Sequence, residues 1–175
     1  VEKVYYDKIH PMEHVIVKPV SVILPVTKDN KIILVNQVRT AVGDKTLYEI
    51  PAGVIDESDY LGPISDEYVE LQAAKRAAIR ELKEETGYVS DVENVRYMFE
   101  AYTSPGFTDE KVYYFLVNNL SEKEKQQLDE DEDIEIHEVE VLEVMKMLRE
   151  NEFKNLSTIA ALQWYKGQIK SNVAF

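Results

Sequence analysis

The sequence contains no cysteine, and its six glycines lie far apart along 175 residues. Without cysteine there are no disulfides, thiolate nucleophiles or cysteine-ligated zinc sites, and a reducing cytoplasm is permitted. The scattered glycines leave no glycine-rich loop of the P-loop or dinucleotide-binding type. No apolar run reaches about 18 residues, and no basic-then-apolar leader precedes the first expected strand. We therefore expect a cytoplasmic protein that does not bind membranes.

Positive charge is also scarce. Twenty Lys and Arg residues against 33 Asp and Glu residues give a formal net charge of −13. Such a field repels phosphate backbones, so no nucleic-acid partner is expected. The composition, 45% hydrophobic and 30% charged, is that of a globular chain. The length predicts a single domain spanning residues 1–175.

Strand and helix patterns are mixed along the chain without strict alternation, which favours the α+β class in a layered α/β/α arrangement. Two runs rich in β-branched residues, 15–26 and 31–38, predict a hairpin. Helical spacing of apolar residues begins at Val69, and Gly87 is placed to cap that helix. Further strands are expected at 47–50, 95–102, 111–117 and near 134–139, and further helices at 121–128, 141–149 and 156–169.

The helix ending at Gly87 carries the clearest chemical signal. Glu81 and Glu85 are four residues apart, so their carboxylates share one helix face, while Arg80 and Glu84 form an oppositely charged pair. The two like charges destabilise an isolated helix by roughly 0.2–0.5 kcal/mol, which a bound divalent cation would reverse. Carboxylate oxygens suit Mg²⁺. A solvated acidic helix face is the alternative interpretation.

Gly53 followed by RELKEETG at residues 80–87 resembles the Nudix box. The second half of the box matches, except that Tyr88 fills a place that is usually aliphatic. The first half departs, because eighteen residues (54–71) stand where the family has five, and Gln72 replaces the expected glutamate. The resemblance implies a Nudix-type α/β/α sandwich around a central mixed β-sheet.

Other segments resemble the ADP-ribose pyrophosphatase branch of this family. EIPAG at residues 49–53 looks like its entry to the box, NQVR at 36–39 resembles a strand end whose arginine meets the diphosphate, and SPG at 104–106 resembles a downstream loop. Several matches in the right order form a stronger signal than any one alone. The substrate contacts implied are Arg39, Glu49, Ser104, Pro105, Gly106 and Glu110.

The same resemblance implies hydrolysis of ADP-ribose to AMP and ribose 5-phosphate. Mg²⁺, with Mn²⁺ as a substitute, would be held by Glu81, Glu85 and the carbonyl of Ala52. Glu84 would be a further catalytic ligand or stay paired with Arg80. In the acidic run 129–133, Glu130 or Glu132 would be the general base or an extra metal ligand. The structural positions implied are Gly53, Gln72, Arg80 and Gly87.

The resemblance also implies a homodimer, in which the N-terminal segment 1–20 contributes contacts. Residues 51–53 predict a turn, and residues 57–68 are expected to loop outward as an inert insertion. Glu70 could take the supporting place of Gln72. Two alternatives stay open: a Nudix hydrolase for a sugar nucleotide or capped RNA, and a module that binds ADP-ribose without cleaving it. Retention of the clustered glutamates argues against the second.

Overall fold

The computed structural model describes residues 2–5, 11–62, 66–128 and 133–173. The predicted mixture of strands and helices is confirmed, with most bounds within a few residues of those expected. No helix in the described part of the chain is long and apolar enough to cross a membrane. The elements are β1 (Glu2–Tyr5), β2 (Pro11–His14), β3 (Val20–Thr27), β4 (Lys31–Arg39), β5 (Lys45–Glu49), β6 (Ala52–Val54), α1 (Glu67–Thr86), β7 (Arg96–Tyr102), β8 (Lys111–Leu120), β9 (Glu135–Glu140), α2 (Val141–Arg149) and α3 (Leu156–Val173).

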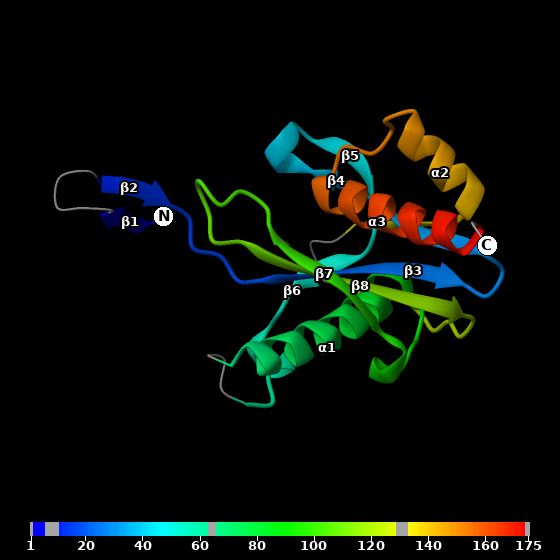
Figure 1. The fold of residues 1–175 in the computed structure, drawn as a ribbon, viewed down its shortest axis with the longest axis horizontal. Helices are drawn as coiled ribbons and strands as arrows, with labels where there is room; N and C mark the ends of the chain where they lie inside the picture. The colour runs from blue at the N-terminus through cyan, green and yellow to red at the C-terminus, as the bar shows by residue number, and fades with distance from the viewer. Residues whose placement is uncertain (1, 6–10, 63–65, 129–132, 174–175) are drawn as a thin grey trace.

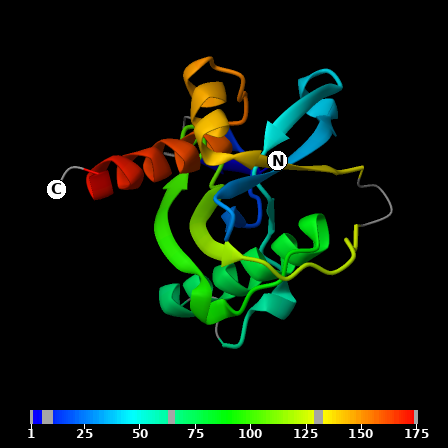
Figure 2. The ribbon, with the colours of Figure 1, turned by 90° about the vertical axis from the view of Figure 1, so that its right-hand side faces the viewer.

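The main sheet has the order β5-β4-β3-β8-β7, with β6 beside β3 and β9 beside β4. It is mixed, because β3 and β8 run parallel while the other pairs are antiparallel. α1 covers one face of the sheet, and α2 and α3 cover the other (Figures 1 and 2). This is the expected α/β/α sandwich.

Strand alternation divides the core into two layers. On β3, Ile23 faces the cluster under α1, whereas Val22 and Leu24 face the cluster under α2 and α3. Because both faces of β3 are buried, the strand is a nearly continuous apolar run. The α1 side of the core is built from small residues, which allow the helix to approach the sheet closely: Ala73, Ala74, Ala77 and Ala78.

The turn predicted at residues 51–53 is wrong. Residues 52–54 form the short strand β6, which pairs antiparallel with β3 through Val20↔Val54 and Val22↔Ala52. The chain passes from β5, a neighbour of β4, to β6, a neighbour of β3, within two residues. The carbonyl of Pro51 accepts a hydrogen bond from the amide of Ile23 at 3.0 Å, which ties this crossing to the sheet.

The helix predicted at 121–128 is also wrong, because this segment is extended along the C-terminal end of α1. The amide of Glu124 donates to the carbonyl of Gly87 at 2.7 Å, and the amide of Gln127 donates to that of Glu84 at 2.9 Å. The last carbonyls of a helix lack partners within the helix. The segment satisfies two carbonyls at this helix end with its own amides, which a local helix could not do.

The N-terminal strands β1 and β2 form a two-stranded antiparallel sheet of their own. Figure 1 shows this hairpin at the end of the molecule, apart from the main sheet. The linker that follows runs along the loop 103–110, since the amide of Val15 donates to the carbonyl of Phe107 at 2.9 Å. The dimer contacts expected of segment 1–20 stay a prediction.

Candidate active site

The candidate catalytic carboxylates lie in the last turns of α1, a helix of 20 residues. The side chain of Asp66 caps its start by accepting from the amides of Tyr68 and Val69. Gly87 caps its end in the left-handed conformation, with φ of 75°, as predicted. These caps fix both ends of the helix that presents Glu81 and Glu85.

β6 passes directly against the two buried carboxylates of α1. A Cβ atom added at Gly53 would lie 1.9 Å from Oε1 of Glu81, so only glycine allows this approach without moving the carboxylate. The amide of Ala52 donates to Oε2 of Glu85 at 3.3 Å. Residues 52–53 and the two glutamates are therefore brought together, whereas the ligand role of the Ala52 carbonyl stays a prediction.

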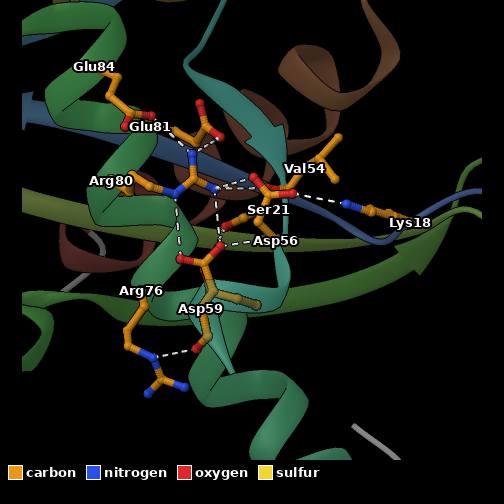
Figure 3. A network of polar contacts seen from close by, with 10 residues as sticks. Lys18, Ser21, Val54, Asp56, Asp59, Arg76, Arg80, Glu81 and Glu84 are labelled. Carbon is orange, nitrogen blue, oxygen red and sulfur yellow. Dashed lines mark hydrogen bonds and ion pairs between the residues drawn. The ribbon is translucent and has the colours of Figure 1, made fainter. Parts of the chain in front are cut away.

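Arg80 lies at the centre of a polar network (Figure 3). Its Nη1 contacts Oε1 of Glu81 at 2.7 Å and Oε2 of Glu84 at 3.0 Å, so the predicted pair of Arg80 and Glu84 is confirmed. Its Nη2 donates to the carbonyl of Val54 at 2.9 Å and to Oδ2 of Asp59 at 3.1 Å. Burial would lower the pKa of Arg80, but the hydrogen bonds to Asp59 and the charge of Glu81 outweigh it, and the pKa is raised.

On the other side of β6, Arg39 and Glu49 form a bidentate ion pair. Nε of Arg39 donates to Oε1 of Glu49 at 3.0 Å, and Nη2 donates to Oε2 at 2.6 Å. The Glu49 side chain is 2% exposed, whereas that of Arg39 is 42% exposed. The buried carboxylate therefore fixes the plane of a guanidinium that still reaches solvent, which suits bidentate recognition of phosphate.

Two pockets meet at β6 and share its residues 52–54. One, of about 310 Å³, is also lined by Arg39, Glu49 and Glu110. The other, of about 270 Å³, is also lined by the glutamates 81 and 84. Three of the predicted substrate residues and two of the predicted metal and catalytic glutamates thus line neighbouring pockets, which share the strand β6.

The donor set of the second pocket fits a hard divalent cation. Within the described part of the chain, no three His, Cys, Asp or Glu side chains are gathered as a ready-made metal cluster. Glu81 and Glu84 line this pocket, and Glu85 lies beside it in contact with the amide of Ala52. Carboxylate oxygens of this kind are the donors that Mg²⁺ prefers. Because Gly53 has no side chain, β6 can lie directly against the carboxylate of Glu81.

A model for the NUDIX domain family matches residues 17–162, a range that holds all residues lining both pockets. The chain belongs to the Nudix family. It is 38% identical over 143 residues to the ADP-ribose pyrophosphatase of Bacillus subtilis, covering 81% of this chain and 69% of the relative. It is 33% identical over 147 residues to the methanol dehydrogenase activator of Bacillus methanolicus, covering 83% and 71%.

A solved structure described as an ADP compounds hydrolase has the same fold, with a TM-score of 0.69. The match covers 88% of this chain and 74% of that one, at 19% sequence identity. The GDP-mannose pyrophosphatase of Escherichia coli K12 is 29% identical over 152 residues, covering 82% of this chain and 71% of the relative.

The outward course expected of residues 57–68 in the Nudix box is wrong for the first half of the segment, whereas the expectation that the segment is functionally inert stays a prediction. Glu57–Asp59 form a 3₁₀ turn, and the Asp59 side chain is buried against Arg80. The carbonyl of Asp59 also accepts from Nε of Arg76 at 2.6 Å. The segment is therefore tied to α1 rather than directed wholly outward. Sequence reasoning missed Asp59 because its partner is 21 residues away across a loop.

The supporting role expected of Glu70 takes a different form. Its Oε1 accepts from the hydroxyl of Tyr113 at 2.6 Å, which fastens α1 to β8. Burial and this hydrogen bond raise the pKa of Tyr113. Gln72 lies half-buried on α1. Glu70 thus anchors the start of the Nudix helix to the sheet, while Asp59 anchors Arg80.

In the described chain, the SPG loop reaches the first pocket only at its C-terminal end, through Glu110. The amides of Phe107 and Thr108 both donate to the carbonyl of Ser104 at 2.9 Å, which makes the loop a compact turn. Glu110 lines the first pocket, whereas Ser104, Pro105 and Gly106 are not among its lining residues in the described chain. Their contact with substrate stays a prediction.

Glu130 and Glu132 lie outside the described residues, and their roles stay predictions. The residues on either side of the acidic run are held near Glu85. Nε2 of Gln126 donates to the carbonyl of Glu85 and, at 3.5 Å, to that of Ile134. Gln127 lines the second pocket together with Glu81 and Glu84.

The start of α3 also lines the first pocket, which sequence reasoning missed. Oδ1 of Asn155 accepts from the amide of Thr158 at 3.0 Å, and the Thr158 hydroxyl accepts from the amide of Ile50 at 3.2 Å. Asn155 before an apolar helix is a readable N-cap signal. This cap lies beside Arg39 and Glu49 because α3 packs against the sheet. No local sequence pattern predicts that packing.

Proposed function

We propose that this chain hydrolyses the diphosphate bond of ADP-ribose or a related nucleoside diphosphate sugar, giving AMP and ribose 5-phosphate from ADP-ribose. The observation that carries the proposal is the pair of pockets meeting at β6, one with a fixed arginine and one with clustered glutamates. The name of the B. subtilis relative, ADP-ribose pyrophosphatase, supports ADP-ribose as the substrate. The name of the E. coli relative, GDP-mannose pyrophosphatase, supports the wider class.

In this mechanism Arg39 binds oxygens of the diphosphate. The bidentate contact with Glu49 holds its guanidinium in one plane before substrate arrives, so little ordering is left to do on binding. A positively charged side chain is needed here because the chain's net charge of −13 repels the anionic diphosphate. Glu110 is proposed to contact the rest of the substrate, together with Ser104, Pro105 and Gly106.

The glutamates of α1 are proposed to hold Mg²⁺ or Mn²⁺ together with the carbonyl of Ala52. A divalent cation bound there supplies charge neutralisation of the diphosphate and lowers the pKa of the attacking water. Burial of Glu81 and Glu85 weakens solvent screening around them. Glu84 keeps its contact with Arg80 or serves as a further ligand, and Glu130 or Glu132 is the proposed general base.

We further propose that residues 1–175 act as a single domain and that two copies form a homodimer through the N-terminal hairpin. The support is that β1 pairs with β2 and the hairpin stands apart from the main sheet (Figure 1). The cytoplasmic location expected from the sequence stays a prediction.

Incubating the protein with ADP-ribose and Mg²⁺, and identifying the products, tests the reaction. We expect AMP and ribose 5-phosphate, loss of turnover when a chelator is added in excess, and recovery with Mg²⁺ or Mn²⁺. The variant E85Q should lose at least about 100-fold in kcat while binding of ADP-ribose changes little, because the lost charge matters most in the transition state.

A panel of nucleoside diphosphate sugars, including GDP-mannose, serves as the comparison. Full activity in excess chelator would contradict the mechanism. Binding of ADP-ribose without any product, under all metal conditions, would favour the non-catalytic binding module. Faster cleavage of another sugar nucleotide would keep the reaction and replace the substrate.

A further inference from the structure

Two buried polar atoms on neighbouring strands have no hydrogen-bond partner among the described residues. They are Oδ1 of Asn36 on β4 and Nε2 of His137 on β9. A buried polar atom left unpaired costs about 1–3 kcal/mol. Because nearly all such atoms in proteins are paired, an exception calls for an explanation, and a bound ion is one of the few that apply.

The register of β4 and β9 brings both atoms together with a carboxylate. Asn36 lies opposite Glu135, and His137, two residues further along β9, lies opposite Leu34. Opposite residues of an antiparallel pair point to the same face of the sheet, as do residues two apart on one strand. Leu34 belongs to the core cluster under α2 and α3. The asparagine, the glutamate and the histidine therefore share that face.

The imidazole and the carboxylate are close without being hydrogen-bonded. Nε2 of His137 lies 3.5 Å from Oε2 of Glu135, and Nε2 forms no hydrogen bond in the described part of the chain. As an ion pair this contact would contribute little, because the Glu135 side chain is 72% exposed. Two ligands that each lie about 2.0–2.1 Å from a tetrahedral cation are roughly 3.3–3.4 Å apart. The observed separation is close to that of a nitrogen and an oxygen bound to one ion.

Tyr48 holds the imidazole from the other side of β4. It lies opposite Asn36 on β5, and its ring packs edge-on against that of His137, with centroids 5.3 Å apart and planes at 77°. This contact restrains the imidazole plane. The His137 side chain is 28% exposed, so solvent and ions reach the site from the side of the more exposed Glu135. The site thus has one restrained ligand and an entry path beside a second.

We propose that His137, Glu135 and Asn36 form a cation site for Zn²⁺, separate from the candidate active site. None of the three is among the described residues that line the two pockets at β6. Imidazole nitrogen suits Zn²⁺, whereas oxygen donors alone, as in the candidate active site, suit Mg²⁺. The imidazole, the carboxylate and the amide oxygen supply three ligands, and water supplies the fourth. A bound ion joins β9 to β4, and this role does not depend on the proposed function.

The test measures Zn²⁺ binding by equilibrium dialysis of the untagged protein, with Mg²⁺ in excess to occupy the oxygen donors of the active site. In H137Q we expect the Zn²⁺ dissociation constant to rise at least about 30-fold, because the donor that favours Zn²⁺ is lost. In N36A it should rise at least about threefold. If H137Q does not fold, E135Q is measured, since its exposed side chain can be changed with little effect on the fold, and a rise of at least about tenfold is expected.

The matched control is H14A, which removes a histidine of the N-terminal hairpin, where His14 pairs with Glu2. Its Zn²⁺ dissociation constant should stay within about twofold of the parent. Urea unfolding of each variant without Zn²⁺ separates loss of binding from loss of the fold. Equal Zn²⁺ affinity in the parent and in folded H137Q or E135Q overturns the proposal, as does a loss of Zn²⁺ binding in H14A that matches the loss in H137Q.

X-ray absorption spectra of the protein loaded with one equivalent of Zn²⁺ identify the ligands directly. We expect one imidazole and oxygen ligands in the parent and in H14A, and oxygen ligands alone in H137Q. Oxygen ligands alone in the parent overturn the proposal, because Zn²⁺ then binds at the active-site glutamates or on the acidic surface. Neither measurement uses a substrate, so a failure to cleave ADP-ribose would refute the proposed function and leave this site to be decided by Zn²⁺ binding.

Discussion

Gly53 sets how closely β6 can approach the carboxylates of α1. An added Cβ would meet only side-chain atoms of Glu81, at 1.9–2.4 Å, and no backbone atom is among its nearest neighbours. The far end of a glutamate side chain can move at low cost. A substitution at Gly53 is therefore expected to change the activity of the site while leaving the stability of the fold largely unchanged.

We predict that G53A folds with a free energy of unfolding within about 1 kcal/mol of the parent but loses most of its activity. The methyl group displaces the carboxylate of Glu81 from its place beside β6, and a misplacement of about 1 Å can cost about 100-fold in rate. Urea unfolding and kcat for ADP-ribose measure the two effects. A variant with parental kcat would show that Glu81 is not needed where the structure places it.

Single residues also show which contacts can be predicted from the sequence. The pair of Arg80 and Glu84 follows from helical periodicity, and it is confirmed. The contact between Arg80 and Asp59 could not be predicted, because it spans a loop whose path depends on the packing of the 3₁₀ turn against α1. Periodicity encodes contacts within an element, whereas contacts between elements require the fold.

At the scale of elements, the end of α1 and the extended segment 121–128 form one unit. Gly87 ends the helix with a positive φ, and its Cβ position would lie 2.3 Å from the carbonyl oxygen of Glu124. The cap was readable from the sequence, but the docking of the segment was not. The helix expected at 121–128 begins with Ser121, a residue type favoured at helix N-caps, but the tertiary pairing with the end of α1 overrides that local preference.

We predict that G87A destabilises the protein by at least about 2 kcal/mol, because strain at positive φ adds to a clash with the backbone. The matched variant is G167A, within α3, where an added Cβ meets nothing within 4 Å. It should stabilise by about 0.5–1 kcal/mol, since alanine loses less backbone entropy in a helix. Urea unfolding measures both, and equal effects of the same sign would contradict this assignment.

Across the whole molecule, tyrosine hydroxyls form hydrogen bonds between elements of different layers. Their ionisation at alkaline pH is therefore expected to change the stability of the fold. Burial, together with a hydrogen bond to Glu138 on β9, raises the pKa of Tyr88 to about 12 from 10.0. The same hydrogen bond lowers the pKa of Glu138. Burial also raises the pKa of several tyrosines on other elements: Tyr60, Tyr97, Tyr113, Tyr114 and Tyr165.

A raised folded-state pKa means that the folded protein holds its phenolic protons more tightly than the unfolded chain. The stabilisation is fully present below pH 10 and is lost as the pH rises from about 10 towards 12. We predict a steep fall in the free energy of unfolding over this range. In Y88F the fall should be smaller by about 1–3 kcal/mol, from a lower starting value because the hydrogen bond to Glu138 is gone. Urea unfolding at stepped pH, with tyrosinate absorbance as a second signal, measures the difference, and parallel curves for parent and variant would rule out a raised pKa at Tyr88.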